Sequence, residues 1–198
     1  MSFELTPATW QLWCFAILVL GMLMAVEWDL REHRIPNTLI LFLLFMGVAV
    51  HAAGPANGRG GIFDAFPGAL GVGSALLGAL AGLIIFLPFY LIRAMGAGDV
   101  KLLVALGAFV GTGEIVGLAL SVLIAGGALA VLRMLLKRNA RLVLGNVKLI
   151  LLGMGHGGAR FDPVTQSADR MPYALSFATG LAVFSYWRLS GGMQILGF

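Results

Sequence analysis

Two aspartates stand beside long apolar runs, where a charge is costly. Asp29 lies in the segment E-W-D-L-R-E-H-R-I-P-N (27–37), and Asp99 lies in the segment G-A-G-D-V-K (96–101). A carboxylate next to a membrane-length apolar run needs water, protein or a partner charge, so a functional site is the first hypothesis for each. The two are 70 residues apart along the chain (29 to 99), so they form one site only if the fold brings them together.

A pair of carboxyl groups can hydrolyse a peptide bond. One must be ionised to activate water, and the other must be protonated to polarise the scissile carbonyl. Held about 3 Å apart, two carboxyls share one proton because both cannot ionise comfortably. A helix dipole favours the anion at Asp99, before the fourth apolar run, and disfavours it at Asp29, just past the end of the first run. We therefore expect Asp29 to hold the shared proton more often.

The composition indicates an integral membrane protein. The chain is 60% hydrophobic and 11% charged, against about 25% charged residues in soluble domains. Six apolar runs approach the roughly 20 residues that a membrane helix requires. We expect an all-α, six-helix transmembrane bundle forming a single domain over residues 1–198. The predicted spans are 10–26, 38–53, 68–92, 100–112, 115–136 and 171–187.

The distribution of basic residues predicts the orientation, because Lys and Arg gather on the cytoplasmic side. With both termini outside, 11 of the 13 basic residues are internal, and only Arg59 and Arg188 are external. The internal ones are Arg31, Arg34, Arg93, Lys101, Arg133, Lys137, Arg138, Arg141, Lys148, Arg160 and Arg170. This N-out, C-out topology places both aspartates at the cytoplasmic face. The net charge of +4 then reflects topology, so no nucleic-acid partner is expected.

The longest predicted connection is cytoplasmic and covers residues 137–170. Its stretch 141–152 is mostly apolar, with Arg141, Gly145 and Lys148 on one helical stripe. Such a pattern is typical of an amphipathic helix lying on an anionic leaflet.

The residues around the aspartates predict how the site is shaped. Gly96 and Gly98 allow positive φ and a close approach of substrate backbone to the loop. In Ile35-Pro36-Asn37, the proline suits a first helical turn, and the side chain of Asn37 or Thr38 can cap the free amides. Lys101 is open to two interpretations, one that it steadies Asp99 or the substrate and one that it is a positive-inside anchor.

These motifs resemble the type IV prepilin peptidases, which are intramembrane aspartic proteases. The resemblance is to the short form associated with tight-adherence (Flp) pili. Asp29 stands six residues before Ile35 of the Ile-Pro-Asn motif, and residues 96–102 match Gly-x-Gly-Asp-Val-Lys-Leu. The pair Pro172-Tyr173, opening the last run, also looks similar, although an interfacial tyrosine is an alternative reading. The resemblance implies that Asp29 and Asp99 are catalytic.

The resemblance also implies a substrate and a location. The substrate would be a pilin-like precursor with a short basic leader ending in glycine, followed by one hydrophobic helix. Cleavage would occur at the cytoplasmic face of the bacterial inner membrane. Larger members carry two Cys-x-x-Cys pairs, whereas this chain has only Cys14. Zinc binding and N-methyltransferase activity are therefore not implied, and no metal or other cofactor is expected.

Other interpretations remain open for the two aspartates. Asp99 taken alone can be a helix cap, and Asp29 a solvated loop charge. The pair can also relay protons in a small proton-coupled transporter. A third possibility is a non-catalytic assembly factor of a pilus or secretion apparatus.

Overall fold

The computed structural model describes residues 6–55, 60–64, 66–92, 95–136 and 173–191. The described residues form helices, with one isolated bridge between Gly60 and Pro67. The helices are α1 (Pro7–Glu32), α2 (Asn37–Ala53), α3 (Gly71–Leu91), α4 (Ala97–Leu136) and α7 (Tyr173–Leu189). The all-helical prediction is confirmed for this part of the chain. The predicted connection and interfacial helix at 137–170 lie outside the described residues, as does Pro172.

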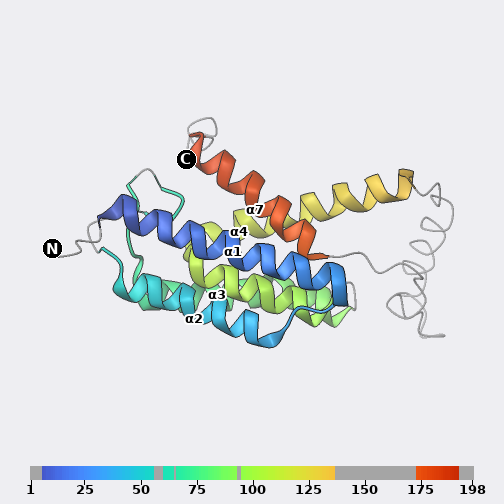
Figure 1. Ribbon diagram of the computed structural model, residues 1–198, viewed down its shortest axis with the longest axis horizontal. Helices are drawn as coiled ribbons and strands as arrows, with labels where there is room; N and C mark the ends of the chain where they lie inside the picture. Colours follow the sequence, from blue (N-terminus) through green and yellow to red (C-terminus); the bar gives the residue numbers. More distant parts are fainter. Residues whose placement is uncertain (1–5, 56–59, 65, 93–94, 137–172, 192–198) are drawn as a thin grey trace.

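Helix α4 consists of two helical segments that meet at Gly111. This residue has φ 73° and ψ −177°, a conformation that is essentially restricted to glycine. The chain turns back on itself there, so the first segment (97–110) runs against the second (112–136) (Figure 1). These segments correspond to the separate apolar runs predicted at 100–112 and 115–136.

The helices have the length and surface of a membrane protein. Among the described residues, α1, α3 and α4 are long and apolar enough to cross a bilayer, and α2 is a shorter apolar helix. Large apolar side chains face outward from several helices, as Leu41 and Ile124 do with 63% and 72% of their surface exposed. In water such a surface would drive association, whereas lipid tails accept it. The protein is thus a helical membrane protein, while the six-span count and the orientation remain predictions.

The first segment of α4 is the centre of the bundle. Its side chains from Leu102 to Val110 are buried with the exception of Val104, which is partly buried. Glycines permit the closest contact, because a Cβ atom added at Gly107 would lie 2.3 Å from the carbonyl oxygen of Gly78 in α3. Gly78 and Gly82 of α3, like Gly107 and Gly111 of α4, have the small-xxx-small spacing that lets membrane helices pack closely. This packing fixes the helix that carries Asp99.

The end of the bundle opposite the aspartates is held by polar contacts. The Arg188 guanidinium of α7 pairs with the carboxylate of Glu114 in α4, and their side chains are 10% and 20% exposed. His51 is buried, with Nε2 bonded to the carbonyl oxygen of Phe109 at 2.6 Å and Nδ1 accepting from the Leu70 amide at 3.1 Å. His51 therefore links α2, α3 and α4, which gives this isolated histidine a structural role.

Candidate active site

Asp29 lies within α1 rather than beyond its end. The helix continues to Glu32 and ends at His33, which has a left-handed backbone (φ 50°). The His33 amide donates a hydrogen bond to the carbonyl oxygen of Asp29. The Asp29 side chain is buried, at 9% exposure. Its Oδ2 accepts a hydrogen bond of 2.9 Å from the Ala174 amide, in the first turn of α7. The interpretation of Asp29 as a solvated loop charge is therefore wrong.

Asp99 is the third residue of α4 and is also buried, at 6% exposure. Its Oδ2 accepts a hydrogen bond of 3.1 Å from the Gly96 amide, which precedes the helix. This is the local half of a capping box, in which a side chain in the first turn reaches back to the amide before the helix. Asp99 therefore bonds the amide before the helix from within the first turn, instead of standing at the N-cap position of the alternative interpretation. Its burial is not explained by this bond alone.

The two aspartates come from different helices, α1 and α4. Both sit at the same end of the bundle, where α1 ends and where α4 and α7 begin (Figure 1). Both side chains are buried there, and a proton shared between them stays a prediction.

The sequence-based preference for a proton on Asp29 rests on an incomplete picture. It assumes that Asp29 meets only the unfavourable C-terminus of α1. The structure adds the N-terminus of α7, whose amide at Ala174 donates to this carboxylate and favours the anion. Each aspartate therefore has one oxygen on an amide at a helix N-terminus, and the preference for a proton on Asp29 stays a prediction.

The Ile-Pro-Asn segment packs against the segment that contains Asp99. A Cβ atom at Gly98 would lie 4.0 Å from the Cβ of Ile35. Lys101 Nζ donates a 3.0 Å hydrogen bond to Oδ1 of Asn37. The structure thus brings together residues that the sequence separates by more than sixty positions.

A family model, described as the type IV leader peptidase family, matches residues 16–131 of the 198-residue chain. The chain belongs to this family. The matched range contains both Asp29 and Asp99 and ends before α7. Among curated proteins and among solved structures, no match is found.

Several predictions about the residues flanking the leader peptidase aspartates need correction. Pro36 is the cap residue of α2 with extended backbone (φ −60°, ψ 133°), so it precedes the first turn instead of occupying it. The Asn37 oxygen accepts from Lys101 instead of capping α2, and Lys101 therefore steadies this junction rather than Asp99. Neither Gly96 nor Gly98 is among the described glycines with positive φ, which are Gly71, Gly111 and Gly191.

The two glycines of the Gly-x-Gly-Asp motif differ in the space around them. A Cβ atom at Gly96 would lie 3.3 Å from Oδ2 of Asp99, tight against the carboxylate. At Gly98 the nearest atoms would be 4.0 Å away on Ile35, so the fold itself leaves room for a side chain there. Packing against the Asp99 carboxylate therefore accounts for a glycine at 96, whereas packing does not require one at 98.

Tyr173 is the first residue of α7 and directly precedes Ala174, whose amide bonds Asp29. It is 37% exposed. This position is compatible with a role in lining the site. Glu27, by contrast, is exposed and pairs with Arg31 at 2.8 Å along the surface of α1.

Sequence reasoning missed the amide of Ala174, which holds one oxygen of Asp29. A backbone amide has no signature in the residue type. The available signal was the Pro172-Tyr173 pair. Proline often stands at the start of a helix, where the backbone amides that follow have no partner within the helix.

Proposed function

We propose that this protein is an aspartic endopeptidase that removes the basic, glycine-ending leader from type IV pilin-like precursors. Asp29 and Asp99 would together activate the attacking water. The observation that supports this most is the burial of two carboxyl groups, from α1 and α4, at the same end of the bundle. Membership of the leader peptidase family supports the general class of reaction.

The amide contacts suggest how the pair operates. Each aspartate has its Oδ2 on a backbone amide, and its Oδ1 remains for water or substrate. The ionised member takes a proton from water as the oxygen attacks the scissile carbonyl carbon. The protonated member donates to the carbonyl oxygen, which becomes a hydroxyl in the tetrahedral intermediate. As the intermediate collapses, the C–N bond breaks and the proton taken from water passes to the leaving amine. One hydroxyl of the intermediate returns its proton to the aspartate that donated it, so the carbonyl re-forms and the pair regains its starting state.

We further propose that this site faces the cytoplasm in the bacterial inner membrane, with six spans and both termini outside. The bias of basic residues supports this orientation. The position of both aspartates at one end of the bundle agrees with a single membrane face (Figure 1). It argues against a proton path across the bilayer, which would need ionisable groups along the way.

The test is cleavage of a candidate precursor in membranes, followed by gel shift. Asp29→Asn and Asp99→Asn should each lower the rate by at least ~100-fold, since each removes a proton-transfer group. Both variants should stay folded, because the amide oxygen of Asn can still accept the backbone hydrogen bond. Asp64→Asn is the matched control, because the Asp64 carboxylate accepts only from its local Phe66 amide among the described hydrogen bonds.

Cleavage at the wild-type rate by either Asn variant would exclude that aspartate from catalysis. A wild-type protein that cleaves no precursor at all would instead favour the assembly-factor interpretation.

A further inference from the structure

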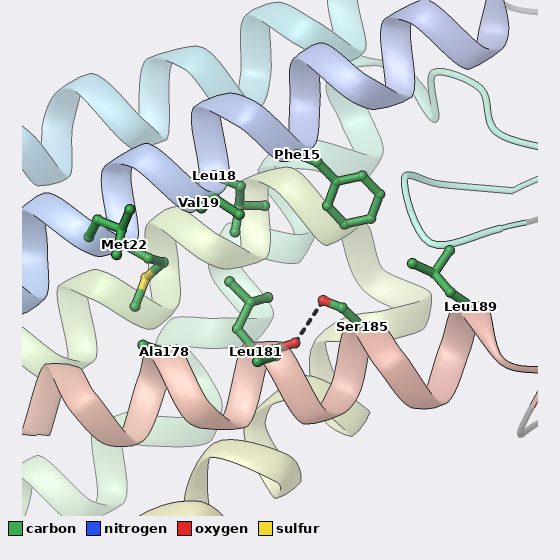
Figure 2. A pocket seen from close by; sticks show the side chains of 10 residues that line it. Phe15, Leu18, Val19, Met22, Ala178, Leu181, Ser185 and Leu189 are labelled. Carbon is green, nitrogen blue, oxygen red and sulfur yellow. Dashed lines mark hydrogen bonds between the residues drawn. The ribbon is translucent and has the colours of Figure 1, made fainter.

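An apolar groove lies between α1 and α7, outside the aspartate site. It has a volume of about 410 Å³ and is open on one side. Figure 2 shows side chains of Leu18 and Met22 from α1 facing Leu181 from α7 across it. The single polar side chain in its lining is Ser185, whose hydroxyl donates to the Leu181 carbonyl at 2.7 Å. The groove therefore offers nothing to a polar ligand.

The groove leads to the aspartate pair. Met22 is seven residues before Asp29, which is two turns along one face of α1 and about 10 Å along its axis. On α7, Ala178 is four residues after Ala174, about 6 Å from the amide that holds Asp29. The groove extends from there along both helices, away from the site.

We propose that this groove binds one face of the substrate's hydrophobic helix, directly after the scissile bond. The inference rests on the proposed function. A chain leaving the aspartates along α1 and α7 crosses the 6–10 Å interval in about two or three extended residues. Its apolar helix then lies in the groove, within the membrane.

The lining suits a helix that packs by shape. Helices in lipid gain little from hydrophobicity alone, so close packing at small residues favours their association. Ala178 and Ala182 provide small residues one turn apart on α7. The substrate helix should therefore present apolar side chains at i, i+3 and i+4 spacing on its bound face.

The experiment compares two substrates in wild-type protein and variants. One is a full precursor with its apolar helix, and the other is a soluble peptide that spans the scissile bond without the helix. Ala182→Trp fills the groove from an exposed position, whereas Val183→Trp adds the same side chain one residue away, outside the lining.

We expect Ala182→Trp to raise KM for the full precursor about 10-fold or more and to leave peptide cleavage within about 2-fold. Val183→Trp should change neither. An unchanged KM for the precursor in Ala182→Trp would overturn the proposal and indicate a groove filled by lipid.

Photocrosslinking gives a readout that does not depend on catalytic rate. A photoreactive residue at Val19, in the lining, should capture the precursor helix in an Asp99→Asn background. The same residue at Leu20, exposed on α1 but outside the lining, should not. Equal capture from both positions, or none from Val19, would refute the groove. Failure of wild-type protein to cleave any substrate would instead refute the proposed function.

Discussion

The replacement Gly98→Ala tests whether substrate binding or the fold requires a glycine at position 98. Gly98 is the second residue of α4, its φ is not positive, and an added Cβ would meet nothing closer than 4.0 Å. Alanine is favoured over glycine in helices by about 0.5–1 kcal/mol. We therefore expect the free energy of unfolding to stay unchanged or to rise by up to about 1 kcal/mol.

Activity should change in the opposite direction. The methyl group would stand one residue before Asp99, where the proposed substrate backbone must approach. A displacement of the scissile carbonyl by about 1 Å costs on the order of 100-fold in rate. We expect kcat/KM for precursor cleavage to fall by about that factor in a protein of equal or greater stability.

The assay pairs unfolding in a denaturing detergent, followed by circular dichroism, with cleavage kinetics on the same preparation. Gly127→Ala is the control, because Gly127 also lies in α4 and an added Cβ would meet nothing within 4 Å. It should raise stability similarly and leave cleavage unchanged. Gly96→Ala does not isolate the effect, because its Cβ would crowd Asp99 itself. Wild-type cleavage by Gly98→Ala would refute the close-approach reasoning.

Two further predictions concern the scaffold. Glu114→Gln should lower the free energy of unfolding by about 3 kcal/mol, because it leaves the poorly exposed Arg188 charge without its partner. The double variant Glu114→Leu/Arg188→Met should recover most of this stability. Additive losses in the double variant would contradict the pairing. Gly107→Val should destabilise the bundle by at least about 1–3 kcal/mol, since its Cβ would lie 2.3 Å from the Gly78 oxygen. Gly113→Val, with nothing within 4 Å of the added Cβ, is the control in the same unfolding assay, and equal stability of the two variants would count against the glycine contact.

The sequence by itself determined the helical membrane class, the two aspartates and the family. Hydropathy depends on the residue types within one window, so it is readable without a fold. It locates helix ends less well, because it measures apolarity and not helicity. Helix α1 continues six residues beyond the predicted end at 26, through Glu27 and Arg31, which pair on its surface. That extension carries Asp29 from an expected loop into a buried position.

Only the tertiary structure decided what surrounds the aspartates. The Ala174 amide reaches Asp29 across 145 positions of sequence, and Lys101 reaches Asn37 across 64. Glu114 has its partner, Arg188, on α7, across 74 positions. Backbone amides and long-range pairs leave no local pattern, since their energy depends on distances that exist only after the helices have packed. The residue types name the groups that are candidates to react, but the packing determined which helix ends and which groove lie beside them.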